Sequence, residues 1–221
     1  MAWFQKRLVL VVLLLAPSIA LPAGAQAHRQ SRPSGDPPPA IPAAQIAQGK
    51  ALGVQAAPIK IEDFTDFECP ACRALYMQTL HPLIEKYVSS GKVYLVHHDF
   101  PLPMHPYSHK AAYYADAAAA IGEFAPVENA LFTHQPQWSS NGHIQPVLAT
   151  VLSPADLRKV DELEKTPEIR GAVERDVELG TRRGVHETPT IYITYKGKRT
   201  PVIGVVSLPI LERYLDALLR Q

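Results

Sequence analysis

The protein has 221 residues, of which 47% are hydrophobic and 19% are charged, as in a globular chain with one domain or one domain and an insertion. Its formal net charge is only +1, which provides no electrostatic footprint for nucleic acid or for anionic lipid. The composition therefore excludes a disordered protein and argues against nucleic acid as a partner.

The first residues have the three parts of a secretory signal peptide. Lys6 and Arg7 precede an apolar run over residues 8–16, and an Ala-Gln-Ala sequence at residues 25–27 has the pattern of a cleavage site. The run is shorter than the roughly 20 apolar residues that span a bilayer. We therefore predict a cleaved signal peptide over residues 1–27 and a periplasmic or other extracytoplasmic location. An uncleaved signal that anchors the protein to the membrane is the alternative.

Residues 28–48 are rich in Pro, Ala, Gln and Ser, which is typical of a disordered or polyproline-like linker. The folded body is predicted to begin after this linker. Its first strand covers residues 59–64, where Ile59, Ile61 and Asp63 alternate with the intervening residues at a period of two.

A helix is predicted next, beginning at Pro70. Its apolar side chains fall on one helical face, formed by Cys72, Tyr76, Leu80, Leu83, Ile84 and Tyr87. Pro82 lacks a backbone N–H and predicts a kink near the middle of this helix. A second strand, apolar on both faces, follows over residues 92–98. Strand, helix and strand within about 40 residues predict a βαβ unit with a parallel pair of strands.

Helical patterns dominate residues 107–183. Ser153 and Thr166 are each followed by a proline and by an acid within the first turn, which is typical of helix N-caps. Gly184 is predicted to end the last of these helices. The aromatic residues of this block are interpreted as its core rather than as a ligand site, and they are Tyr107, Tyr113, Tyr114, Phe124, Phe132 and Trp138.

Two strands over residues 190–194 and 200–204, joined by a turn at Lys196-Gly197, predict a hairpin, and an amphipathic helix over residues 208–219 follows. The order of elements predicts an α/β fold, a thioredoxin-like βαβ…ββα sheet with an inserted all-helical subdomain. In this interpretation residues 49–105 and 184–221 form the thioredoxin-like domain, and residues 106–183 form the helical insertion.

The only cysteines of the chain, Cys69 and Cys72, form one Cys-Pro-Ala-Cys motif at the predicted start of the helix. A disulfide between them closes almost no chain and adds little to stability, so the pair is predicted to do chemistry. The free N–H groups and positive dipole at a helix start stabilise a thiolate, which is the form that attacks disulfides. We expect an exposed Cys69 to attack and a shielded Cys72, one turn further in, to resolve the mixed disulfide.

A Cys-x-x-Cys pair is also half of a zinc site, but a structural zinc site needs four ligands. The sequence has no second cysteine pair, and His105 and His109, which are four residues apart, do not complete such a set. We therefore predict no metal and no cofactor. The alternatives from another functional class are a metal carrier and a holdase that uses an apolar surface around Pro189.

Three segments together resemble the DsbA family of thiol–disulfide oxidoreductases. They are residues 63–72 with the cysteine motif, a His-Asp-Phe-Pro-Leu sequence at residues 98–102, and residues 184–190 with a Thr-Pro pair. The resemblance extends over residues 49–220 and implies a thioredoxin-like fold with a helical insertion. By position, it implies that Cys69 is the nucleophile, that Cys72 is the resolving thiol, and that Pro70 and Ala71 tune them.

The resemblance also implies roles outside the motif. Pro189 would be a cis-proline that faces the disulfide, and Thr188 would offer backbone hydrogen bonds to a substrate peptide. Asp63 matches the buried acid of the family, which can take the proton from Cys72 during resolution. The alternative for Asp63 is a strand-end acid paired with a cation such as Lys60.

Other polar residues near the motif are interpreted as solvated or hydrogen-bonded neighbours, and they are Asp66, Glu68, His97 and His98. Glu68 has a second interpretation, since its charge would raise the pKa of Cys69 by repulsion.

The function implied by the resemblance is an exported thiol–disulfide oxidoreductase, with an oxidase favoured over a reductase. Its expected partners are unfolded or partly folded exported proteins and a membrane redox partner, and the chain is expected to be a monomer. Ala71 stands where the better-known oxidase has a histidine, which removes one stabiliser of the thiolate. Thr188 also resembles the residue at that position in the isomerase and reductase branches and in the Gram-positive oxidases, so the direction of electron flow depends on the reduction potential.

Overall fold

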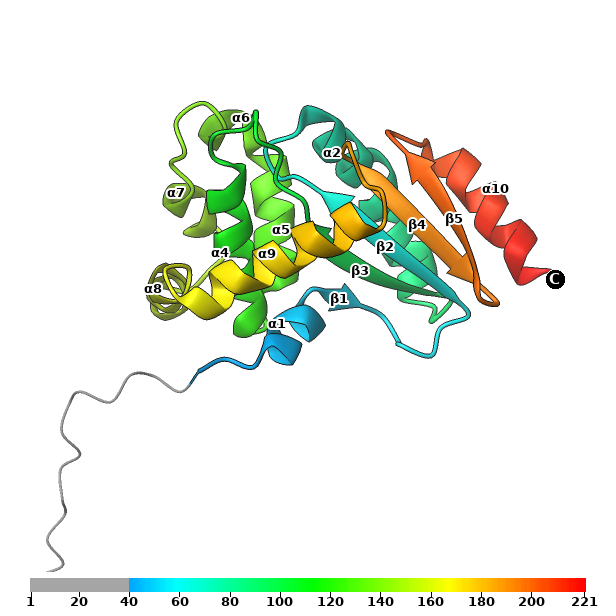
Figure 1. Ribbon diagram of the computed structural model, residues 1–221, viewed down its shortest axis with the longest axis horizontal. Helices are drawn as coiled ribbons and strands as arrows, with labels where there is room; N and C mark the ends of the chain where they lie inside the picture. Colours follow the sequence, from blue (N-terminus) through cyan, green and yellow to red (C-terminus); the bar gives the residue numbers. More distant parts are fainter. Residues whose placement is uncertain (1–39) are drawn as a thin grey trace, which may run out of the picture. The chain divides into compact units, whose positions relative to one another are not determined.

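Five strands form one mixed sheet, in the order β1-β3-β2-β4-β5, in a computed structural model that describes residues 40–221 (Figure 1). The strands are β1 (Ala51–Leu52), β2 (Ile59–Thr65), β3 (Val93–Asp99), β4 (Thr190–Tyr195) and β5 (Lys198–Ile203). β2 and β3 are parallel, as the βαβ pattern predicts, and the other neighbouring pairs are antiparallel. β2 is the central strand, and its carboxyl end leads to the cysteine motif.

The crossover from β2 to β3 is helical throughout but not regular. α2 (Pro70–Leu75) continues into the π-helical segment η1 (Tyr76–Leu80), then α3 (His81–Leu83) and a second π-helical segment, η2 (Ile84–Val88). Pro82 cannot donate a helical hydrogen bond, and the two π-helical segments flank it. The predicted apolar face is confirmed, since all six of its residues are buried except the half-buried Ile84.

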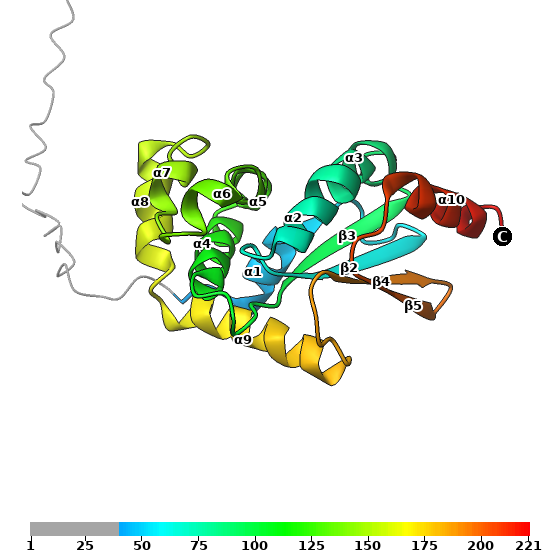
Figure 2. The same ribbon diagram turned by 90° about the horizontal axis from the view of Figure 1, so that it is seen from above.

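Helices fill the region between β3 and β4, and they are α4 (Ser108–Ala120), α5 (Phe124–Thr133), α6 (Gln135–Trp138), α7 (Gln145–Leu148), α8 (Pro154–Leu163) and α9 (Pro167–Arg182). The predicted N-caps are confirmed, because Ser153 accepts from the N–H of Asp156 and Thr166 from the N–H of Ile169. Gly184 follows α9 with φ of 77°, a conformation that suits glycine at a helix end. Figure 2 shows α2 and α3 on one side of the sheet and α9 on the other.

The β4–β5 hairpin turns at Lys196 and Gly197, whose φ values of 45° and 77° are the pair of positive angles that a tight hairpin turn requires. The chain then forms α10 (Leu208–Leu219), which packs against η1 and α3. Leu211 and Leu215 are the fully buried residues of its apolar stripe. The expected terminal ββα unit is therefore present.

The prediction of a linker over residues 28–48 is wrong at its carboxyl end. α1 (Ala43–Gly49) forms there, packs against α4 and α9, and buries Ile46 completely. A side-chain carbon on Gly49 would collide with the backbone of Ala119, so the close approach of α1 to α4 requires glycine on one side. The predicted signal peptide and the first part of the predicted linker lie outside the described residues.

The main core is shared by the sheet and the helical insertion. Of the aromatic residues interpreted as core, Tyr114, Phe124, Phe132 and Trp138 are buried, while Tyr107 and Tyr113 are half-buried and pack against the core. Within residues 40–221, no helix is both long enough and apolar enough to cross a membrane.

Candidate functional site

Cys69 and Cys72 lie at the amino end of α2, where Cys69 is the N-cap and Pro70 occupies the first turn. Proline suits this place because the missing N–H would have no helical partner there. Both thiols are free. The Cys69 Sγ lies 3.5 Å from the carbonyl oxygen of Thr188, and the peptide bond between Thr188 and Pro189 is cis. The fold thus brings together two loops that are 119 residues apart in the sequence.

The two thiols differ in acidity. The pKa of Cys69 is lowered to about 5, first by a hydrogen bond from Cys72 and further by backbone N–H groups at the helix start. The pKa of Cys72 is raised well above its usual value, chiefly by burial and then by the hydrogen bond and charge of Cys69. At neutral pH the site therefore holds a Cys69 thiolate and a Cys72 thiol, the ionisation states that attack and resolution need.

The expectation of an exposed Cys69 is wrong in degree. The exposed fraction of Cys69 is 7%, against 1% for Cys72. Thr188, whose carbonyl oxygen lies 3.5 Å from the Cys69 Sγ, is buried, while Pro70 is exposed and Ala71 half-exposed. Cys69 still has the greater access of the two thiols.

The loop before Cys69 is held by buried polar side chains. The Asp66 carboxylate accepts a hydrogen bond from the N–H of Leu102 at 2.9 Å, and the backbone nitrogen of Asp66 lies 3.4 Å from the Cys72 Sγ. Glu68 accepts from the N–H of Tyr107 at 2.7 Å. The two acids are hydrogen-bonded neighbours, one of the two environments expected for them. Glu68 is not among the largest causes of the pKa shift of Cys69, which is downward, so repulsion by Glu68 does not dominate the acidity of this thiol.

The helical insertion supports the same loop through Gln135, which the sequence analysis did not identify. Its side-chain amide donates to the carbonyl oxygens of Phe67 at 2.7 Å and Cys69 at 3.0 Å. Arg73 of α2 also donates to the carbonyl oxygen of Phe132 at 2.8 Å. A glutamine in a helical block carries no sequence signal for this role, because the contact depends on how the insertion packs on the sheet.

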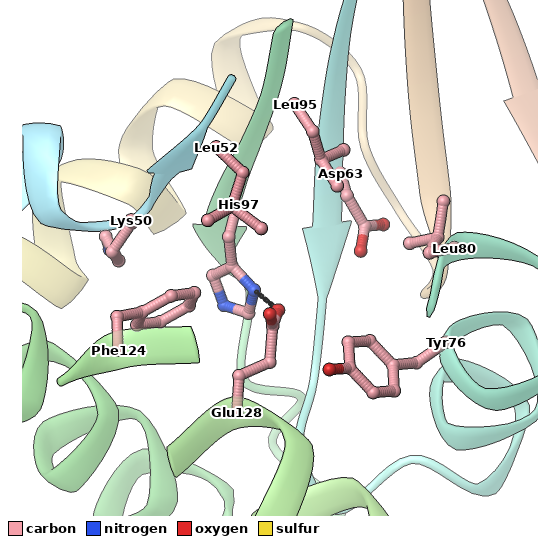
Figure 3. Close-up of a pocket in the computed structure, with 9 residues that line it drawn as sticks. All are labelled: Lys50, Leu52, Asp63, Tyr76, Leu80, Leu95, His97, Phe124 and Glu128. Carbon is pink, nitrogen blue, oxygen red and sulfur yellow. Dashed lines mark hydrogen bonds and ion pairs between the residues drawn. The ribbon is translucent and has the colours of Figure 1, made fainter. Parts of the chain in front are cut away.

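Asp63 lines a small cavity whose walls include neither cysteine (Figure 3). The alternative pairing with Lys60 is not formed, because Lys60 binds Glu62 at 2.8 Å. Asp63 is 4% exposed, and its Oδ1 has no hydrogen-bond partner. Burial raises the pKa of Asp63 to about 7, with His97 opposing the shift and Glu128 adding to it. Within residues 40–221, no hydrogen bond joins Asp63 to Cys72 directly.

Next to this cavity lies a buried cluster of charged side chains, most of which the sequence did not predict. His97 lies 2.9 Å from Glu128 and 3.2 Å from Asp99. Lys50, which precedes β1, lies 2.6 Å from Asp99, 2.8 Å from Asp116 and 2.6 Å from Asp176. Lys50 thus joins the amino-terminal segment to β3, α4 and α9. No local sequence pattern predicts this cluster, because its members lie far apart in the chain and meet only in the folded structure.

The histidines that were considered as metal ligands have other contacts. His105 binds Asp66 at 2.6 Å, and His109 lies 3.9 Å from Glu174 on the surface. In the part of the chain that the structure describes, no group of three or more His, Cys, Asp and Glu side chains is arranged to hold a metal ion.

Comparison with known proteins gives a consistent result. A family model described as thioredoxin matches residues 46–201. A probable disulfide bond formation protein D of Bacillus cereus is 25% identical over 157 residues, which cover 65% of this chain and 69% of that protein. The crystal structure of α-DsbA1 from Wolbachia pipientis shares the fold with a TM-score of 0.66 at 20% identity, covering 76% of this chain and 89% of that one.

Another relative is much longer. The Na(+)/H(+) antiporter NhaA 3 of Salinispora tropica is 29% identical over 181 residues, and the match covers 76% of this chain. The chain spans only 25% of the length of that antiporter. The likeness therefore concerns one part of a larger protein.

Proposed function

The chain belongs to the thioredoxin family, and from this premise we propose that it is a thiol–disulfide oxidoreductase of the DsbA type whose Cys69 and Cys72 exchange disulfides with exported proteins. The observation that carries the proposal is the unequal acidity of the two thiols, with the pKa of Cys69 lowered to about 5 beside a buried Cys72. Thr188 and Pro189 form the surface against which a substrate peptide would lie, and Pro70 and Ala71 border it.

The exchange takes place in two steps whose atoms balance. When the protein acts as oxidant, a substrate thiolate attacks the Cys69 sulfur of the Cys69–Cys72 disulfide, and the Cys72 thiolate leaves and takes up a proton. A second substrate thiolate then attacks the substrate sulfur of the mixed disulfide, and Cys69 leaves as a thiolate. Substrate gains one disulfide and the protein becomes a dithiol. The reductase reaction is the reverse.

Replacement of the resolving thiol is expected to trap the mixed disulfide. In Cys72→Ala, Cys69 still attacks a protein disulfide, but no second thiol of the protein can displace the substrate. We expect a covalent complex with a reduced-and-reoxidised test protein that is stable on a non-reducing gel and is lost on adding reductant. The Cys69→Ala variant is the matched control. Equal trapping by both variants would show that Cys69 is not the attacking sulfur.

The direction of exchange is proposed to be oxidative. A low pKa stabilises the Cys69 thiolate, hence the reduced protein, and so makes the disulfide form a better oxidant. At equilibrium in glutathione buffers we expect a reduction potential above about −180 mV, the range of oxidants rather than of thioredoxin-like reductases. A potential near about −270 mV would instead assign the protein as a reductase.

The proposed setting is extracytoplasmic. The predicted signal over residues 1–27 and the disulfide bond formation protein among its relatives support an exported protein. The substrates would be unfolded or partly folded exported proteins, and a membrane redox partner would restore the disulfide. The protein is proposed to act as a monomer.

A further inference from the structure

The small cavity lined by Asp63 and His97 contains an acid whose hydrogen-bonding capacity is not filled. Asp63 Oδ1 is buried without a partner, although buried carboxylate oxygens are ordinarily hydrogen-bonded. The cavity has a volume of about 10 Å³, which is room for about one water. Figure 3 shows the Asp63 carboxyl, the Tyr76 hydroxyl and the His97–Glu128 pair around this space.

His97 is the cationic neighbour with the largest effect on Asp63. The two residues are direct partners in the β2–β3 ladder. The imidazole is held at both nitrogens, by Glu128 of α5 and by Asp99 of the same strand, and it stacks on Phe67 with ring centroids 5.1 Å apart. Burial alone would lower the pKa of His97, but the two carboxylates raise it to about 10, so the ring is a fixed imidazolium at neutral pH.

We propose that the His97–Glu128 pair is a positioning element for Asp63, which keeps that carboxyl able to exchange a proton with Cys72 at neutral pH. The inference rests on the proposed function, because it concerns the proton that Cys72 must gain when the disulfide opens and lose when it closes. It applies to both directions of exchange. Through Glu128, the helical insertion takes part in the chemistry of the sheet.

The path from Asp63 to Cys72 follows the face of β2. Asp63 and Thr65 are two residues apart, so their side chains leave the same face about 6.6 Å apart. The Thr65 side chain also faces the Cys72 thiol, where it lowers the pKa of that thiol against the larger effect of burial. The Thr65 side chain therefore shares a strand face with the acid and lies next to the buried thiol.

The charges around Asp63 act in opposite directions. From β3, His97 and His98 favour the Asp63 carboxylate, while Glu128 of α5 disfavours it. Lys50 and the Tyr76 hydroxyl also line the cavity, and its remaining walls are apolar side chains, Leu52, Leu80, Leu95 and Phe124. Removing His97 should therefore raise the pKa of Asp63 from its value of about 7, and removing the Glu128 charge should lower it.

The test measures resolution by Cys72 as a function of pH with dithionitrobenzoate. The Cys69 thiolate displaces one aromatic thiolate and forms a mixed disulfide. Cys72 then loses its proton, attacks the Cys69 sulfur, and releases a second aromatic thiolate while the Cys69–Cys72 disulfide forms. The rate of the second release should rise with pH about a midpoint near the pKa of Asp63, about 7.

The expected result is a pair of opposite shifts. His97→Gln should move the midpoint up and Glu128→Gln should move it down, each by about 0.5–1.5 pH units. In Glu128→Gln, Asp99 still binds the His97 imidazolium. Because glutamine is nearly isosteric with glutamate, this variant alone can test the proposal if His97→Gln does not fold. Neither change should have an effect in an Asp63→Asn background. Glu212→Gln, which removes a carboxylate paired with Lys86 on the outer surface, is the control and should leave the midpoint unchanged.

Two results overturn different claims. The role of the His97–Glu128 pair is overturned if the midpoint stays in place in both variants, or if it still shifts in the Asp63→Asn background. In either case, release of both aromatic thiolates would still support the proposed function. If the wild-type protein gives no first release from Cys69, the proposed function itself fails, and the inference fails with it.

Discussion

Cys69→Ala is expected to lower the rate of disulfide exchange by more than about 10³-fold, to the rate without protein. Cys69 supplies the attacking thiolate, and its pKa of about 5 keeps that thiolate populated at neutral pH. Cys72 cannot replace it, because Cys72 is 1% exposed and burial raises the pKa of its thiol. The measurement is oxidation of a reduced model dithiol peptide, and separately the reduction of insulin.

A structural explanation for such a loss can be tested in the same samples. Cys→Ala at this helix start removes one sulfur and its stabilised thiolate, so the free energy of unfolding at neutral pH should fall by no more than about 3 kcal/mol and the variant should remain folded. Cys72→Ala is the matched variant, since it should retain the first attack and release one aromatic thiolate from dithionitrobenzoate. Exchange that persists in Cys69→Ala at more than a tenth of the wild-type rate would contradict the proposed mechanism, and a chaperone-like binding activity would then have to be considered.

Lys50→Met is expected to lower the free energy of unfolding by about 3–5 kcal/mol. Lys50 is 3% exposed and is the shared cation of Asp99, Asp116 and Asp176. Methionine has similar length but no charge, so the three carboxyl groups lose their common counter-ion in a site from which water is excluded. Urea unfolding monitored by circular dichroism measures the difference.

The loss should depend on pH in a defined direction. Burial alone would raise the pKa of Asp99, but Lys50 and His97 hold it below its usual range, so Asp99 contributes stability that is present at neutral pH and is lost as the pH falls. Without Lys50 these carboxyl groups take up protons at a higher pH. The difference between the variant and the wild-type protein should therefore be largest at and above neutral pH, and it should shrink in acid.

Lys60→Met provides the comparison. Lys60 also has a carboxylate at 2.8 Å, but its side chain is 42% exposed. Glu62 is buried but keeps Arg183 at 2.9 Å when Lys60 is replaced, so we expect the loss of this exposed cation to cost only about 0–1 kcal/mol. Two results would contradict a stabilising role of the buried cluster. One is an equal loss of unfolding free energy in Lys50→Met and Lys60→Met, and the other is a loss in Lys50→Met that increases as the pH falls.

The sequence alone determined the features that depend on residues near one another in the chain. The βαβ unit, the two helix N-caps and the hairpin at Lys196-Gly197 each arise from a short pattern with its own preferred backbone geometry. The sequence also predicted that Cys69 and Cys72 lie at the start of a helix, because proline at position 70 favours the first turn of a helix. Where α1 forms, the alanine and proline content predicted a linker instead. The sequence does not show that Ile46 packs into the core, and that packing holds α1 in place.

Only the tertiary structure decided the electrostatics of the site. Thr188 reaches Cys69 across 119 residues, and Glu128 reaches His97 across 31, so neither contact follows from a local period. The acidity of Asp63 depends on burial and on these distant charges rather than on its neighbours in the sequence. Ionisation is set by the groups that packing brings within a few ångströms, and for that physical reason the Cys-Pro-Ala-Cys motif indicated which atoms react, while the surrounding fold sets how they gain and lose their protons.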